Sequence, residues 1–108
     1  MVLVANATNV PGAAGRLTAQ LQAAGFQMME ATNAAGNEEF LDVTKVYVRP
    51  GGEVVAQSIS LVMGGVALAA MPTPAWITGA NAALGDATVL VMLGKDLAGK
   101  TPPGLQGR

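Results

Sequence analysis

The sequence predicts an α/β fold, a β-α-β-β-α-β two-layer sandwich with a sheet of about four strands and two main helices. Short apolar runs that suit buried strands alternate with stretches in which apolar residues recur at helical spacing. The chain has 108 residues, of which 51% are hydrophobic and 12% charged, which suits one domain with a single core. The alternative is a mostly parallel sheet with a short third helix.

The chain is expected to open with a strand and a helix. Residues 2–5 are a continuous apolar run closed by Asn6, as in a strand buried on both faces. Gly25 can adopt the left-handed conformation that commonly ends a helix, and Phe26 follows as an apolar contact. The helix should begin at Gly12, because apolar residues then repeat every three or four positions, at Ala14, Leu17, Leu21 and Ala24.

The middle of the chain predicts two further strands around a connection. Residues 26–33 are the second strand. The connection 33–43 carries acidic residues where one turn of helix would begin. Residues 44–49 alternate inward valines with polar side chains, which predicts the third strand. Pro50 ends that strand and suits the first turn of a second helix.

The second half of the chain predicts a helix and one or two strands. The glycine pair 64–65 closes the helix, and part of 66–71 adds an edge strand. Trp76 and Ile77 are expected to pin the long connection that follows. Residues 87–94 are the most apolar strand candidate and should lie in the middle of the sheet. The helix itself is indicated by Val55, Ile59, Val62 and Val66.

Two strand orders remain open. A ferredoxin-like sandwich places strands one and three in the centre and the fourth at an edge, against which the apolar character of the last strand argues. A mostly parallel sheet instead uses residues 33–43 as a crossover. The parallel sheet brings the strand ends at Asn6, Arg49 and Lys95 to one edge, where open α/β folds bind ligands. The ferredoxin-like order points them to opposite edges.

Composition excludes several classes of function. Six basic and seven acidic residues leave a net charge of −1, so no positive field exists to attract nucleic acid. The chain has no cysteine, which excludes a disulfide scaffold and thiolate chemistry. The apolar stretch 61–71 is shorter than the roughly 20 residues that a membrane-spanning helix needs. The aromatic residues are expected to anchor the core: Phe26, Phe40, Tyr47 and Trp76.

The polar residues do not suggest an enzyme. Histidine, the usual proton carrier near neutral pH, is absent. Ser58 and Ser60 therefore have no histidine partner for a triad. The acidic residues Glu38, Glu39 and Asp42 lack the alternating oxygen ligands of a calcium loop, so they are interpreted as solvated charges at a helix start. We expect no catalytic residue, no metal and no cofactor.

The stretch "NATNVPGAAGR", residues 6–16, is the main candidate site. Two glycines precede a helix whose backbone amides could hold an anion. The competing interpretation is a strand-to-helix turn, capped by Thr8 or Asn9. A charge-assisted arginine contact would strengthen phosphate binding. The candidate ligand-binding residues are Asn6, Thr8, Asn9, Gly12, Arg16 and Arg49.

Three blocks of the sequence resemble a known family. The blocks are "VLVANATNVPGAAGRLTAQLQAAGF", "TKVYVRPGGEVVAQSIS" and "DATVLVMLGKDL". Their order and spacing are similar to the LytR C-terminal domain family, although Ala7 and Asn9 stand where the family usually has glycines. The resemblance implies a domain over residues 1–97, and residues 98–108 are expected to form a flexible tail.

The resemblance also implies a cellular setting. It points to a non-catalytic, extracytoplasmic binding or scaffolding domain in cell-envelope assembly or integrity, as in small membrane-anchored proteins of actinobacteria. The expected partner is a LytR-CpsA-Psr-type phosphotransferase or a cell-wall polymer, with a missing N-terminal anchor as the tether to the plasma membrane. One alternative is a receptor for a small phosphate-bearing or glycan ligand at the first strand-helix loop. Self-association into a homo-oligomer is another.

Overall fold

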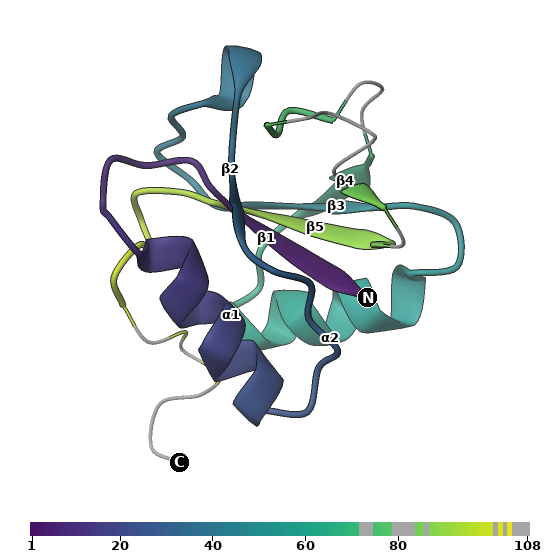
Figure 1. Cartoon of the computed structure of the whole chain (residues 1–108). Coiled ribbons are helices and arrows are strands. Elements are labelled where there is room, and N and C mark those ends of the chain that lie inside the picture. The colour runs from purple at the N-terminus through teal and green to yellow at the C-terminus, as the bar shows by residue number, and fades with distance from the viewer. Residues whose placement is uncertain (72–74, 79–83, 86, 101, 103, 105–108) are drawn as a thin grey trace.

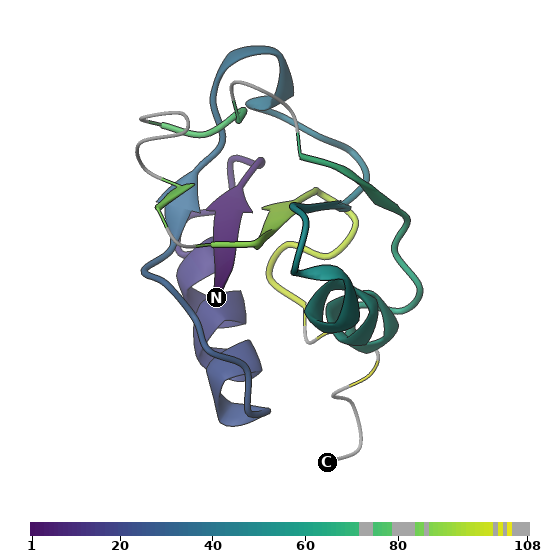
Figure 2. The same ribbon diagram turned by 90° about the vertical axis from the view of Figure 1, so that its right-hand side faces the viewer.

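The computed structural model describes residues 1–71, 75–78, 84–85, 87–100, 102 and 104. In this part of the chain a five-stranded sheet carries two α-helices on one face, and irregular connections cover the other face (Figure 1). Figure 2, turned by 90°, shows both helices on the same side of the sheet. The predicted α/β two-layer class is confirmed, with one strand more than the predicted four.

The helices and strands follow one another along the chain in the predicted order, with the edge strand in addition. They are β1 (Val2–Asn6), α1 (Ala13–Ala23), β2 (Thr32–Asn33), the 3₁₀ helix η1 (Gly36–Glu38), β3 (Lys45–Val48), α2 (Glu53–Val62), β4 (Leu68–Ala70) and β5 (Val89–Leu93).

The strand order of the sheet is β2-β1-β5-β3-β4. β1 pairs in parallel with β2 and β5, and β3 pairs in parallel with β4, whereas β3 and β5 are antiparallel. The ferredoxin-like order is therefore wrong, because β5 is central and β3 lies beside it. The mostly parallel alternative is closer, and η1 supplies its short third helix. Residues 87–94 were expected in the middle of the sheet, and β5 occupies that place.

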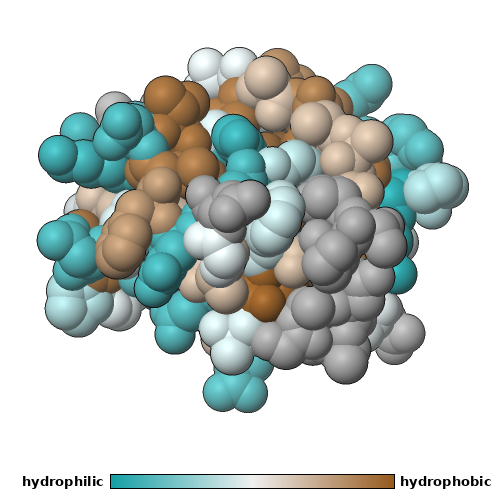
Figure 3. Space-filling model, turned by 90° about the horizontal axis from the view of Figure 1, so that it is seen from above, coloured by the Kyte–Doolittle hydropathy of each residue, from teal (hydrophilic) through white to brown (hydrophobic). Residues whose placement is uncertain are grey.

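The sheet is buried on both faces. Val4 and Val91 face the helices and pack with Leu21 and Ile59 in one core cluster. Alternate residues such as Leu90 face the connections and belong to a second cluster. All five residues of β5 are buried because each face of this strand is covered, which explains its continuous apolar sequence. Seen from above, over the connections, hydrophilic side chains in teal lie among hydrophobic ones in brown (Figure 3).

Helix α1 ends as predicted and begins differently. Gly25 has a φ of 104°, and its N–H donates to the Gln22 carbonyl while the Phe26 N–H donates to that of Leu21, the bonds of a Schellman end. At the start, Gly12 is the N-cap and no side chain caps the helix. The predicted cap by Thr8 or Asn9 is therefore wrong, because the Thr8 hydroxyl is bonded within the preceding turn.

The predicted second strand, residues 26–33, is mostly irregular. It runs beside β1, with Met28 in an isolated bridge to Val2 and regular pairing only over β2. The predicted edge strand within 66–71 is β4. Ile77 is buried and bridges to Ala34, as expected of a residue that pins its connection.

The end of the chain is described only in part. Leu97 and Ala98 pack against the helix-side core, and Pro102 is buried. Within the predicted tail, residues 101, 103 and 105–108 lie outside the described residues, as do 72–74, 79–83 and 86 of the long connection. The boundary at residue 97 stays a prediction. Among the described residues, no helix combines the length and apolar character needed to cross a membrane.

Candidate functional site

The turn after β1 is folded by its own side chains. The Asn6 amide donates to the Val10 carbonyl at 2.9 Å, and its oxygen accepts from the Thr8 N–H at 3.1 Å and the Thr8 hydroxyl at 2.6 Å. The Thr8 hydroxyl oxygen in turn accepts from the Val10 N–H at 3.2 Å. These bonds make an Asx-type turn, so Asn6 and Thr8 serve first to shape the backbone.

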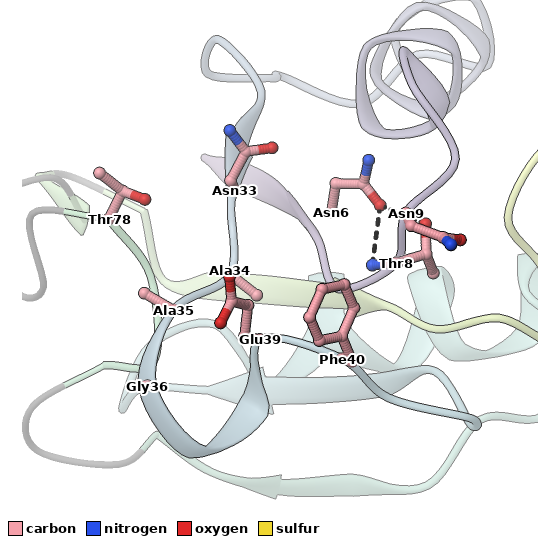
Figure 4. Close-up of a pocket in the computed structure, with 10 residues that line it drawn as sticks. All are labelled: Asn6, Thr8, Asn9, Asn33, Ala34, Ala35, Gly36, Glu39, Phe40 and Thr78. Carbon is pink, nitrogen blue, oxygen red and sulfur yellow. Dashed lines mark hydrogen bonds between the residues drawn. The ribbon is translucent and has the colours of Figure 1, made fainter.

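A cleft opens beside this turn, at the carboxyl ends of β1 and β2 (Figure 4). We call it the strand-end cleft, and its volume is about 470 Å³. In Figure 4 the Phe40 ring stands next to the Asn6–Asn9 turn, and Asn33 and Thr78 stand across from it. The lining residues are Asn6, Thr8, Asn9, Asn33, Ala34, Ala35, Gly36, Glu39, Phe40 and Thr78.

The lining of the strand-end cleft is polar but carries little charge. Asn9 and Asn33 present exposed side-chain amides, and Thr78 adds a hydroxyl. Glu39 is its charged residue, and no lining residue is basic. Phe40 is 66% exposed, so the expectation that it anchors the core is wrong. An exposed ring among amides and hydroxyls gives the cleft an apolar surface with hydrogen-bonding groups around it.

Main-chain hydrogen bonds hold the walls of the cleft in place. The Ala34 N–H donates to the Asn6 carbonyl at 3.0 Å, and the Leu41 N–H donates to that of Ala7 at 2.8 Å. The Thr78 N–H donates to the Asn33 carbonyl at 2.9 Å. The segments around Ala34 and Leu41 are thus bonded to the turn, and the segment around Thr78 is bonded to the first of these. A ligand would meet a site whose ordering cost is already met by folding.

The structure brings together only half of the predicted site residues. Asn6, Thr8 and Asn9 line the cleft, whereas Gly12 and Arg16 do not. The Arg16 guanidinium lies exposed and donates to the Gly99 carbonyl at 3.4 Å. Arg16 therefore extends toward the end of the chain and away from the cleft.

Arg49 lies at the other edge of the sheet. It follows β3, which runs antiparallel to β5, so the end of β3 points away from the end of β1. Its guanidinium donates to the Gly85 carbonyl at 3.0 Å. Lys95 follows β5, which is parallel to β1, and stays at the Asn6 edge. The antiparallel β3–β5 pairing therefore separates Arg49 from any shared site with Asn6.

Sequence reasoning missed Asn33, Glu39, Phe40 and Thr78 as cleft residues. Asn33 had a usable signal, since it closes the second strand as Asn6 closes the first. Phe40 gave the opposite signal, because an aromatic side chain usually indicates core. Thr78 reaches the cleft through the pairing of its segment with residues 33–35, for which the local sequence gives no sign.

A second polar group lies outside the cleft, around the 8%-exposed Glu38. The Tyr47 hydroxyl donates to Oε1 of Glu38 and the Lys45 ammonium donates to Oε2, each at 2.6 Å. Burial, and then the bond to Glu38, raises the pKa of Tyr47. The same carboxylate, through its hydrogen bond, raises the pKa of Lys45. These bonds connect η1 to β3, with Tyr47 on the face of the sheet that the connections cover.

The raised pKa values predict a loss of stability in alkali. A group whose pKa is higher in the folded state stabilises the fold below its unfolded pKa, and this stabilisation is lost as pH rises through the folded pKa. For Tyr47 and Lys45 the loss begins above about pH 10. Tyr47 is the only tyrosine, so tyrosinate absorbance during alkaline titration should give its pKa directly, above the ordinary value.

Glu38→Gln provides the control for this titration. It keeps the side-chain shape but removes the negative charge, so the pKa of Tyr47 should move down toward its ordinary value. An ordinary tyrosine titration in the unchanged, folded protein would contradict the Glu38–Tyr47 bond.

At the Asn6 edge, a third contact joins the start of β3 to the end of β5. The Thr44 N–H and hydroxyl both donate to one Asp96 carboxylate oxygen, at 2.9 and 2.7 Å. The Thr44 hydroxyl also accepts from the Gly94 N–H at 2.9 Å. We call this the Thr44–Asp96 clamp. No three acidic, histidine or cysteine residues gather as metal ligands among the described residues.

One of three comparisons with known proteins gave a match. The family model described as LytR cell envelope-related transcriptional attenuator matches residues 1–97. The chain belongs to the LytR C-terminal domain family. Neither curated proteins nor solved structures gave a match. The resemblance drawn from the three sequence blocks is thereby confirmed, and with it a relation to the cell envelope. The description of the family names no catalytic activity.

In this LytR C-terminal domain, residues that carry the family resemblance form turns and joints. Asn6 and Thr8 fold the first turn, and Gly25 ends the first helix. Thr44 and Asp96, from the second and third blocks, form the clamp. Asn6, Thr8 and the clamp set the backbone of the Asn6 edge, and the exposed side chains of the cleft lie beside them.

Proposed function

We propose that this LytR C-terminal domain is a non-catalytic binding and scaffolding domain of the cell envelope that holds a wall glycan in the strand-end cleft. It works outside the cytoplasmic membrane, tethered through the rest of its protein, beside a LytR-CpsA-Psr-type phosphotransferase. The family relation to the envelope supports the setting. The observation that carries the proposal is the pre-organised cleft with amides, hydroxyls and an exposed ring.

The chemistry of the cleft suits a sugar. Each sugar hydroxyl both donates and accepts hydrogen bonds. In the side chains of Asn9 and Asn33 the amide NH2 donates and the amide oxygen accepts, so each can pair with such a hydroxyl. Neither amide has a hydrogen-bond partner within the described part of the chain. The face of a sugar ring is largely C–H and packs on an aromatic ring such as that of Phe40. A neutral, hydroxyl-rich ring is thus matched on two sides.

A small phosphate-bearing ligand fits the same cleft less well. The charged residue of the lining is Glu39, whose carboxylate would repel a phosphate. Arg16 and Arg49, the cations expected to bind it, donate to backbone carbonyls elsewhere. The glycan alternative is therefore favoured over the phosphate one.

Two side chains with catalytic potential take part in hydrogen bonds of the fold. The Glu38 carboxylate accepts from Tyr47 and Lys45, and the Ser60 hydroxyl donates to the Val66 carbonyl. The chain has no cysteine to serve as a nucleophile and no histidine to activate one. These contacts support a domain that binds without making or breaking bonds.

Binding to purified wall glycan tests the proposal. Phe40→Ala should weaken binding by roughly tenfold, because it removes the stacking surface, worth about 1.4 kcal/mol. Asn33→Ala should weaken it by a smaller factor. Leu61→Ala is the matched control, since Leu61 is 75% exposed on α2, outside the cleft lining, and should bind as the unchanged domain does. Calorimetry on soluble glycan fragments measures all four proteins.

Two outcomes would count against the glycan. If the unchanged domain retains no wall glycan at physiological salt, the proposed glycan function is wrong. If it captures a phosphotransferase and Phe40→Ala leaves that capture intact, the scaffolding role stands on a protein surface outside the cleft.

A further inference from the structure

A second cavity adjoins the strand-end cleft. Its volume is about 200 Å³, and it shares Thr8, Asn9 and Phe40 with the larger cleft. Because both cavities use the same three residues as a wall, they adjoin each other at Phe40, and we call the two together the groove. The smaller cavity is completed by Ala7, Leu41, Asp42 and Lys95.

The groove is longer than one sugar ring. Asn33 ends β2, Asn6 ends β1 and Lys95 follows β5, and these strands are neighbours in the sheet. Adjacent strands lie about 4.8 Å apart, so the groove crosses roughly 10 Å from the β2 end to the β5 end. A single ring cannot contact both ends and still stack on Phe40. The groove is therefore sized for at least two linked rings.

The two ends of the groove differ in charge. Glu39 lines the β2 end, and Lys95 lines the β5 end together with Asp42. Within the described residues the ion pair is Lys45–Glu38, and the Lys95 ammonium has no such partner. The ammonium is therefore free to bind an anionic group.

The position of Lys95 is fixed by the backbone. Its N–H donates to the Leu41 carbonyl at 2.8 Å, and the Asp96 N–H donates to that of Asp42 at 3.1 Å. The Leu41 N–H in turn donates to Ala7. Lys95 and the Phe40 segment are thus joined through one set of main-chain bonds, and their spacing does not depend on the ligand.

We propose that the groove binds an extended acidic oligosaccharide in one orientation, with one ring stacked on Phe40 and a carboxylate substituent on Lys95. This rests on the proposed function, and it adds the length, the charge and the direction of the ligand. Glu39 enforces the direction, because a carboxylate at the β2 end would meet a like charge. Neutral amides at that end accept the unsubstituted sugar.

Calorimetry with three probes tests this. The probes are N-acetylglucosamine, its neutral tetrasaccharide, and a tetrasaccharide of the same length with a lactyl carboxylate on alternate sugars. The tetrasaccharides should bind roughly tenfold more tightly than the single sugar, or better, because they contact both cavities. The acidic one should bind about three to five times more tightly than the neutral one at low salt, as expected for an exposed ion pair.

Three variants locate the charge effect. Lys95→Gln should abolish the preference for the acidic probe, because it removes the ammonium that the carboxylate contacts. Asp42→Asn should increase the preference, because it removes the like charge beside Lys95. Lys100→Gln is the matched control, since Lys100 is also exposed but lies outside the groove lining, and it should change nothing.

The possible results separate the two proposals. Equal binding of the acidic and neutral tetrasaccharides, or an unchanged preference in Lys95→Gln, overturns the oriented acidic ligand and leaves the glycan function standing. Equal binding of the single sugar and the tetrasaccharides overturns the extended groove. Absence of binding to every probe overturns both proposals.

Discussion

Gly94→Ala is expected to destabilise the domain by about 3 to 5 kcal/mol, or to prevent folding, through overpacking against a rigid neighbour. A Cβ atom at Gly94 would lie 2.5 Å from the Val43 carbonyl carbon and 2.6 Å from the Thr44 nitrogen. Both are main-chain atoms held by the Thr44–Asp96 clamp, so neither can move aside cheaply. The free energy of unfolding from urea titration measures the effect.

Gly15→Ala is the matched control with the opposite sign. Gly15 lies in α1, and a Cβ there would meet nothing within 4 Å. Alanine is favoured over glycine inside a helix by about 0.8–1.0 kcal/mol, so this variant should be more stable than the unchanged domain. A Gly94→Ala protein as stable as the parent would show that the end of β5 does not approach Val43 as closely as described.

Asp96→Ala is expected to lower the free energy of unfolding by about 2 to 4 kcal/mol. Its carboxylate accepts from both the N–H and the hydroxyl of Thr44, and Thr44 is buried. Removing the carboxylate leaves the Thr44 N–H and hydroxyl buried without this hydrogen-bond acceptor. A buried polar group that loses its partner costs about 1–3 kcal/mol. The same urea titration measures the loss.

Asp96→Asn separates the charge from the hydrogen bonds. The amide oxygen still accepts from Thr44, so this variant should keep most of the stability and lose only the charge-assisted part. If Asp96→Ala and Asp96→Asn are equally close to the parent, the clamp contributes little and the start of β3 is held by sheet pairing alone.

The clamp also connects stability with the proposed binding groove. The segment from Phe40 to Thr44 is bonded near both ends to the residues that follow β5, Leu41 to Lys95 and Thr44 to Asp96. Loosening one end by Asp96→Ala should therefore let the Phe40 ring and Lys95 drift apart. A folded Asp96→Ala protein is thus expected to bind the tetrasaccharides more weakly than its retained fold would suggest.

Local signals in the sequence were sufficient for most of the fold. Gly25 and Phe26 predicted the end of α1, and the continuous apolar run of residues 87–94 predicted a central strand. Both features depend on chemistry that a residue carries with it, positive φ in glycine and the need of an apolar run for two covered faces. The weak strand at residues 26–33 showed the opposite case, because its pairing with β1 is irregular.

The candidate site was predictable only where it is local. The turn at Asn6 and Thr8 is visible in sequence because the side chains bond within five residues of one another. Arg49 was grouped with Asn6 on the assumption that strands run in one direction, and the antiparallel β3–β5 pair moves it to the other edge. Phe40 was assigned to the core on hydrophobicity alone.

The sequence by itself determined the α/β class, the C-terminal end of α1, the central strand, the family and the absence of histidine and cysteine, since each depends on residue type and short-range spacing. Only the tertiary structure decided the direction of β3, and with it which polar side chains share an edge. It also decided that Phe40 faces solvent beside Asn9 and Lys95. Strand direction and the exposure of a loop residue arise from contacts between distant segments, which no local pattern encodes.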